Sequence, residues 1–179
     1  TREAGSAGPA LTFIKALMAL DKPIVMAVQG QATGIGTTML LHADLVVAAE
    51  SARFFTAFID LALVPEAGSS LIFPALIGRQ NAARLLLAGD TLTADEALRM
   101  GLVAYCVPDA ELAERAAALC EKLCAKSPTS MRYSKQLMRD GIRSQAIAEQ
   151  IDREAELFGE RLFSDEVRQI MERFLSRKK

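Results

Sequence analysis

Up to about residue 108, the chain alternates short apolar runs with segments of helical periodicity. The runs IVMAVQG and DLVVAA are apolar and rich in β-branched residues, as in strands buried on both faces; ARFFTA is a shorter run, and GLVAYCVP stops at Pro108. Parallel strands need a crossover between them, usually a helix. The alternation therefore predicts an α/β fold with a parallel sheet.

Several of the intervening segments predict helices. PALTFIKALMALDKP repeats apolar residues on one face and stops before Pro23, and TTMLLHA follows a glycine-rich turn. GSSLIFPALIG ends at Gly78, which can cap a helix, and RQNAARLLLAG has a glycine just past its end. TADEALRM opens with Thr93 and Glu96 in the spacing of a capping box.

Beyond Pro108 the pattern becomes helical only. DAELAERAAALCEKLCAK predicts a long amphipathic helix, and helical periodicity continues to the end of the chain. We therefore divide the sequence into an α/β core over residues 1–125 and a helical segment over residues 126–179. The apolar side chains of that segment must be covered by its own core or by another subunit; they include Leu157, Phe158, Leu162, Phe163, Ile170, Met171 and Phe174.

The charge balance argues against nucleic acid and membranes as partners. The 179 residues carry 21 basic and 22 acidic side chains, a net charge of -1. The apolar stretch 23–49 is interrupted by polar residues and does not predict a bilayer span. Three cysteines without CxxC spacing and a single His42 predict a reducing, cytoplasmic setting without a metal site. Cys120 and Cys124, one helical turn apart, are expected in the core.

The first candidate site is the glycine-rich turn GQATGIGTT. Its glycines allow close backbone approach, and the helix that follows leaves N–H groups for an anion or a developing oxyanion. A turn that needs glycine for packing alone explains the pattern equally well. A dinucleotide-binding fingerprint does not, because Met39 stands where its third glycine would be.

The second candidate is Glu66 in LVPEAGSS. The helix dipole favours a carboxylate near a helix start, so it could account for Glu66 without a catalytic role. Its apolar neighbours instead suggest burial, which raises a carboxyl pKa toward the range useful for proton transfer. Asp60 could be a second carboxylate beside Glu66 or could pair with Arg53. His42 is expected to be a hydrogen-bonded core residue.

The two ends of the chain offer weaker signals. The opening TREAGSAGPA is expected to be a flexible lead-in. The terminal SRKK is expected to be solvated, with a phosphate-bearing ligand as the alternative.

Taken in order, the motifs of this chain resemble the enoyl-CoA hydratase/isomerase, or crotonase, superfamily. The resemblance implies a spiral of β-β-α turns, N-terminally incomplete here, and a helical C-terminal segment that assembles subunits into trimers or dimers of trimers. The motifs are K-P at 22–23, the glycine-rich turn, A-D-L at 43–45, P-E-A-G at 65–68, L-x-G-D at 87–90, A-x-E-A at 94–97 and G-L-V at 101–103.

The resemblance also implies an acyl-CoA thioester as substrate, with no further cofactor. The thioester oxygen would be held by two backbone N–H groups, the second from Ile35 between Gly34 and Gly36. The first N–H would come from an N-terminal segment of the family. No residues before PALTFIKAL resemble that segment, so Thr1 looks like a start partway through the domain. Thr38 and Phe58 stand where the two glutamates of the hydratases would be.

Members that resemble the Δ3,Δ2-enoyl-CoA isomerases carry one glutamate at the position of Glu66. The resemblance therefore implies an isomerase of fatty acid metabolism with Glu66 as its catalytic residue and a pocket that includes Thr38, Phe54, Phe58 and Leu61. The alternatives are a hydratase or another crotonase reaction such as thioester hydrolysis or dehalogenation, and a non-catalytic relative. The remaining alternative is a Rossmann-type dinucleotide binder, which Met39 in place of the third glycine argues against.

Overall fold

The computed structural model describes residues 8–139 and 141–176. The expected lead-in up to residue 7 and the basic end at residues 177–179 lie outside them. The α-helices are α1 (Pro9–Ala19), α2 (Ile35–Thr38), α3 (Ser69–Ile77), α4 (Arg79–Leu86), α5 (Ala94–Met100), α6 (Leu112–Cys124), α7 (Pro128–Met138), α8 (Gly141–Leu162) and α9 (Asp165–Ser176). The strands are β1 (Val25–Val28), β2 (Gln31–Thr33), β3 (Leu45–Ala49), β4 (Arg53–Phe55), β5 (Leu92–Thr93) and β6 (Tyr105–Val107). The 3₁₀ helices are η1 (Met39–His42), η2 (Ile59–Leu61) and η3 (Asp109–Glu111).

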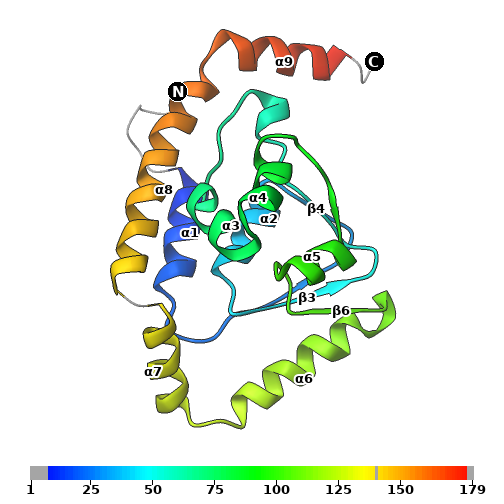
Figure 1. Cartoon of the computed structure of the whole chain (residues 1–179), viewed down its shortest axis with the longest axis vertical. Helices are drawn as coiled ribbons and strands as arrows, with labels where there is room; N and C mark the ends of the chain where they lie inside the picture. The colour runs from blue at the N-terminus through cyan, green and yellow to red at the C-terminus, as the bar shows by residue number, and fades with distance from the viewer. Residues whose placement is uncertain (1–7, 140, 177–179) are drawn as a thin grey trace.

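The strands form two three-stranded sheets (Figure 1). In the first, ordered β1-β3-β6, both pairs are parallel, with Val25 opposite Leu45 and Val47 opposite Tyr105. In the second, ordered β2-β4-β5, β2 and β4 are parallel while β5 is antiparallel. The first four strands alternate between the sheets, so β1-β2-α2 and β3-β4-α3 are consecutive β-β-α turns. The predicted parallel α/β fold is confirmed.

Strands β2 and β5 are absent from the sequence predictions. They are three and two residues long, too short for an alternating pattern to distinguish them from a turn. The predicted GLVAYCVP strand is also too long, because Gly101 has a positive φ of 81° at the end of α5 and strand pairing begins only at Tyr105. TTMLLHA is not one α-helix, since α2 ends at Thr38 and a 3₁₀ turn continues to His42.

Three clusters of buried side chains form the core. The largest lies between the second sheet and α3, α4 and α5 and contains the fully buried Phe54 and Phe73. The second packs α6 on the first sheet through Leu112 and Leu119. Cys120 and Cys124 lie outside that face and are exposed, so their predicted burial is wrong. The third joins α1, the loop before α3, and α8.

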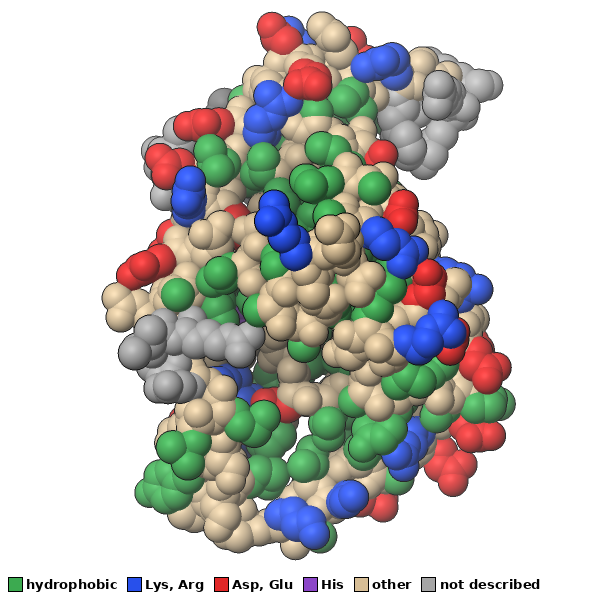
Figure 2. All heavy atoms as spheres, in the orientation of Figure 1, with side chains coloured by type: hydrophobic (Ala, Val, Ile, Leu, Met, Phe, Trp, Pro, Cys, Tyr) green, Lys and Arg blue, Asp and Glu red, His purple; other side chains and the backbone are tan. Residues whose placement is uncertain are grey.

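The helical segment packs partly on the core of its own chain. Ile151 of α8 is 1% exposed and Val167 of α9 is 3% exposed. Lys135 of α7 is buried, and its Nζ lies 2.6 Å from Asp44 Oδ2 and 2.6 Å from the carbonyl oxygen of Lys22. Other large apolar side chains of this segment remain exposed, and hydrophobic side chains gather over α7 and along α6 in Figure 2. They include Leu137, Met138, Phe163 and Leu175.

In the part of the chain that the structure describes, none of the helices combines the length and the apolar character needed to cross a bilayer.

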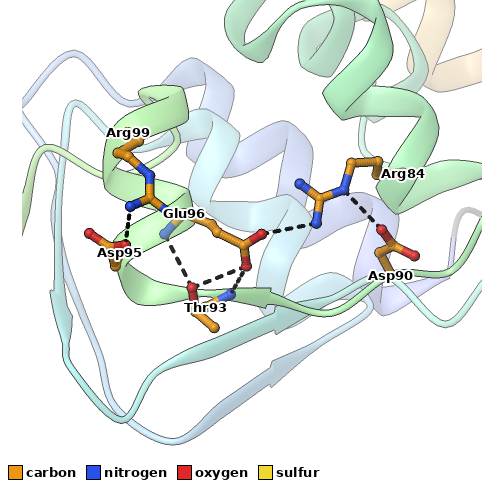
Figure 3. Close-up of polar contacts among 6 residues, drawn as sticks. All are labelled: Arg84, Asp90, Thr93, Asp95, Glu96 and Arg99. Atoms are coloured by element: carbon orange, nitrogen blue, oxygen red, sulfur yellow. Dashed lines mark hydrogen bonds and ion pairs between the residues drawn. The ribbon is translucent and has the colours of Figure 1, made fainter.

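The predicted capping box is confirmed and belongs to a larger polar network (Figure 3). Glu96 N donates to Thr93 Oγ1 at 3.2 Å, and Glu96 Oε2 accepts from Thr93 N at 2.9 Å. Arg84 of α4 donates to Asp90 at 2.9 Å and to Glu96 Oε1 at 3.0 Å. The network therefore fixes α4, the loop after it and the start of α5 relative to one another.

We expect Glu96→Gln to destabilise the fold and to change its pH dependence. The backbone N–H of Thr93 and the guanidinium of Arg84 lower the pKa of Glu96 to about 2. Because the folded-state pKa is lowered, the stabilisation is present above the ordinary glutamate pKa of about 4.3 and is lost as the pH falls toward 2. Urea unfolding at pH 7 should show a loss of about 1 kcal/mol, allowing for partial exposure.

Asp95→Asn is the matched control, since Asp95 pairs with Arg99 on the exposed face of the same helix (Figure 3). An exposed pair of this kind should contribute about 0.5 kcal/mol or less. Equal losses for the two substitutions would contradict a special role of the Glu96 network.

Candidate active site

The glycine-rich turn links β2 to α2 and presents backbone N–H groups at the start of that helix. Gly34 has φ 55° and ψ −119°, a conformation open to glycine and strained for other residues. Its N–H donates to Phe55 O at 2.8 Å, and its carbonyl accepts from Thr37 N and Thr38 N at 2.9 and 3.0 Å. The N–H groups of Ile35 and Gly36 come before these and have no acceptor within the helix, so their predicted contact with a ligand stays a prediction.

Glu66 lies in the loop between η2 and α3, directly before two residues with left-handed backbone. Ala67 has φ 62° and Gly68 has φ 72°. The Glu66 carbonyl accepts from Ser69 N at 3.1 Å, and the carbonyl of Ala67 lies 2.8 Å from His42 Nε2. His42 is buried, which lowers its pKa, so its predicted place as a hydrogen-bonded core residue is confirmed.

The two candidate segments meet through Thr38 and Glu66. The fully buried Thr38 hydroxyl donates a short hydrogen bond to Glu66 Oε1. Burial raises the pKa of Glu66; the Thr38 bond opposes this rise, and the charge of Glu154 adds to it. The arrangement is a half-buried carboxyl group of raised pKa that accepts a hydrogen bond from the hydroxyl of Thr38, the last residue of the glycine-rich turn. Such a group can exchange a proton with a weak carbon acid near neutral pH.

The other predicted site residues are placed as follows. Phe54 and Phe58 are both buried in the largest core cluster, and Leu61 packs against that cluster, so their contact with a substrate stays a prediction. Gly36 lines a surface hollow between the edge strands β1 and β2 and the α2–η1 turn. The other lining residues are Met26, Ala27, Val28, Gln29, Gln31, Ala32, Met39 and Leu40.

Asp60 pairs with neither Glu66 nor Arg53, the two partners considered for it from the sequence. Among the described residues, no hydrogen bond or ion pair links Asp60 to Glu66 or to Arg53, whose guanidinium donates to the carbonyls of Glu50 and Ala52. Three or more His, Cys, Asp or Glu side chains placed to share a metal ion are also not found within the described ranges.

One buried carboxylate beside the site was missed by the sequence analysis. Glu154 of α8 is 3% exposed and reaches the start of α3, where Gly68 N donates to it at 2.6 Å. The two residues are 86 positions apart. No local capping pattern could have identified the contact, because Gly68, the residue before α3, has no capping side chain.

Nearly the whole chain is similar to known proteins. The family model described as enoyl-CoA hydratase/isomerase matches residues 2–179. The crystal structure of an enoyl-CoA hydratase/isomerase from Pseudoalteromonas atlantica T6c superposes with a TM-score of 0.92 and 39% identity, over 98% of this chain and 70% of that one. The architecture is therefore shared with a solved member of the family.

Two curated relatives carry different enzyme names. The mouse peroxisomal enoyl-CoA delta isomerase 3 is 38% identical over 127 residues, 71% of this chain and 40% of its own length. The Escherichia coli 2,3-dehydroadipyl-CoA hydratase is 35% identical over 144 residues, 79% of this chain and 55% of its own length. The chain thus spans about half the length of these relatives. Its match from residue 2 to residue 179 and its fold place it in the enoyl-CoA hydratase/isomerase family.

Proposed function

We propose that this chain forms the catalytic part of an enoyl-CoA isomerase that moves a double bond by proton transfer on an acyl-CoA thioester. One observation supports the proposal most directly. Glu66 is half-buried, its pKa is raised, and its carboxyl group accepts a hydrogen bond from the Thr38 hydroxyl. A relative named as an enoyl-CoA delta isomerase gives the reaction class. A single carboxyl group is sufficient for this reaction because nothing is added to the substrate.

In the proposed mechanism Glu66 acts first as a base and then as an acid. Its carboxylate removes a proton from C2 of a 3-enoyl-CoA, and the C2–H electrons delocalise into the thioester to form a dienolate. The N–H of Ile35 donates to the thioester oxygen as negative charge develops there, the kind of preorganised donor that lowers such barriers. The protonated Glu66 then returns the proton to C4, which gives the 2-enoyl-CoA and regenerates the carboxylate.

Hydration is the second candidate, and a relative named as a hydratase favours it. Addition of water needs a group that activates the water and another that protonates C2. At the positions where the family resemblance expects the two glutamates, this chain has Thr38, whose hydroxyl holds Glu66, and Phe58, which is buried in the core. Neither side chain titrates near neutral pH, so isomerisation accounts better for the residues present.

The test is a product analysis with the intact protein. Incubation with a 3-enoyl-CoA should give the 2-enoyl-CoA, and incubation with a 2-enoyl-CoA should give little or no 3-hydroxyacyl-CoA. Rapid accumulation of the 3-hydroxyacyl-CoA from the 2-enoyl-CoA would favour the hydratase alternative and contradict the proposal.

We also propose that α7 to α9 assemble the protein into a trimer or a dimer of trimers. The exposed Leu137, Met138 and Phe163 support an interface, since side chains of this size lose exposure to water when subunits associate. Light scattering coupled to size exclusion should give three or six subunits. A monomer at micromolar concentration would contradict the proposal.

A further inference from the structure

The most unusual buried group outside the proposed mechanism is Glu154. Its Oε2 accepts from Gly68 N at 2.6 Å, and its Oε1 accepts from Ser70 N at 2.9 Å and from Ser70 Oγ at 2.5 Å. Gln150, one turn earlier on α8, donates to the same Ser70 hydroxyl at 2.8 Å. A side chain from the C-terminal segment therefore satisfies the first N–H groups of α3, where the helix dipole also favours a negative charge.

The segment held in this way is the turn that carries Glu66. A left-handed backbone at Ala67 is costly for a residue with a Cβ and persists only where the surroundings impose it. On one side His42 contacts the Ala67 carbonyl, and on the other Glu154 binds the next N–H, that of Gly68. The turn is thus clamped between η1 and α8.

Packing leaves this turn little freedom to relax. A Cβ placed on Gly68 would lie 3.2 Å from Ile147 Cγ2 and 3.2 Å from Ile151 Cγ1, so α8 lies directly against the backbone there. Ile151 and Ala67 belong to the same buried cluster. A change in the position of α8 would therefore move the backbone that directs Glu66.

The charged and titratable groups around this turn come from several elements. Thr38 contacts Glu66 from α2, and Glu154 acts on it from α8. His42, with Arg139 acting on it from the end of α7, faces the Ala67 carbonyl rather than the Glu66 carboxyl. Of the charges in this group, that of Glu154 is the one that disfavours ionisation of Glu66.

From this geometry we infer that Glu154 is a positioning residue, which holds the Ala67–Gly68 turn so that the Glu66 carboxyl faces the reacting carbons. The inference rests on the proposed function of Glu66. The C-terminal helical segment then contributes to the proton-transfer site of its own chain. It does so through a contact between residues too far apart in the sequence to form a local motif.

The test substitutes Glu154→Gln in the intact protein, with Glu156→Gln as the matched control on the exposed side of the same helix. The glutamine keeps the size of the side chain but removes its charge and one acceptor. We expect kcat for double-bond migration to fall about tenfold or more, as for a slightly misplaced reacting group, with KM changed less than twofold. The acidic limb of the kcat profile should move to lower pH, because the like charge is gone. Glu156→Gln should match wild type in both.

A second readout does not need activity. Titration of 13C-carboxyl-labelled glutamates by NMR, with the Glu66 signal assigned by Glu66→Gln, should show a lower Glu66 pKa in Glu154→Gln than in wild type. If the Glu154 variant does not fold, Ser70→Ala, which removes one donor to Glu154 but keeps its charge, should lower kcat by less and leave the Glu66 pKa raised. A folded Glu154→Gln with unchanged kcat and unchanged Glu66 titration overturns the inference. If wild type lacks isomerase activity, the proposed function fails and the inference fails with it; an active wild type with unchanged kcat and titration in Glu154→Gln overturns the inference alone.

Discussion

Glu66→Gln should reduce the rate of double-bond migration by about 10²- to 10⁴-fold, the contribution typical of a positioned general acid–base group. The amide keeps the shape of the side chain and can still contact Thr38, but it cannot accept and return a proton at neutral pH. Binding of an unreactive acyl-CoA analogue should be nearly unchanged. The loss should therefore fall on kcat, which steady-state assays of the intact protein measure directly.

The same substitution should not destabilise the fold. The pKa of Glu66 is raised in the folded state, so its ionisation costs stability above the ordinary glutamate pKa, and that cost grows as the pH rises through the folded-state pKa. Glu66→Gln removes the cost. Its free energy of unfolding at neutral pH should equal or exceed that of wild type, with the difference vanishing in acid. A variant that is both inactive and clearly less stable would point to a structural role for Glu66.

Ile35→Pro should be the second large effect, with a loss of about 10²- to 10³-fold in kcat/KM. Proline removes the N–H that the proposed mechanism directs at the thioester oxygen. Position 35 is the first residue of α2, where proline fits a helix, and the preceding Gly34 has no Cβ to clash with the ring. The loss should therefore reflect the missing donor rather than a disrupted helix.

Ile35→Ala is the control for this substitution. It keeps the N–H and removes part of a side chain that packs against the cluster formed by Ile14, Ala67 and Ile151. We expect near wild-type kcat/KM with a modest loss of stability. If Ile35→Ala and Ile35→Pro lose activity equally, packing of the side chain matters and the N–H donor does not.

The sequence was sufficient for those parts of the fold that depend on local patterns. Apolar runs separated by helical segments predicted the parallel α/β core, and the spacing of Thr93 and Glu96 predicted a capping box. These features follow from interactions between residues close in the chain. Strands β2 and β5 were missed because so few residues have no detectable period.

The candidate site depended more on the fold than on local pattern. Spacing alone left Glu66 as either a helix-dipole residue or a base, since Thr38 is 28 positions away and only folding brings its hydroxyl to Glu66. The contact of Glu154 with Gly68 spans 86 positions and had no signal in the sequence. Cys120 and Cys124 were misjudged for a related reason, because helical spacing identifies a shared face but not which face the sheet covers.

The central claim is that one carboxyl group carries a proton from C2 to C4. The most direct measurement is a single turnover of a 3-enoyl-CoA deuterated at C2, followed by analysis of the 2-enoyl-CoA product. The proposal predicts deuterium at C4 in a measurable fraction of the product, because Glu66 returns the hydrogen that it removed. A product whose C4 carries only solvent hydrogen, or a 3-hydroxyacyl-CoA in place of the 2-enoyl-CoA, would contradict it.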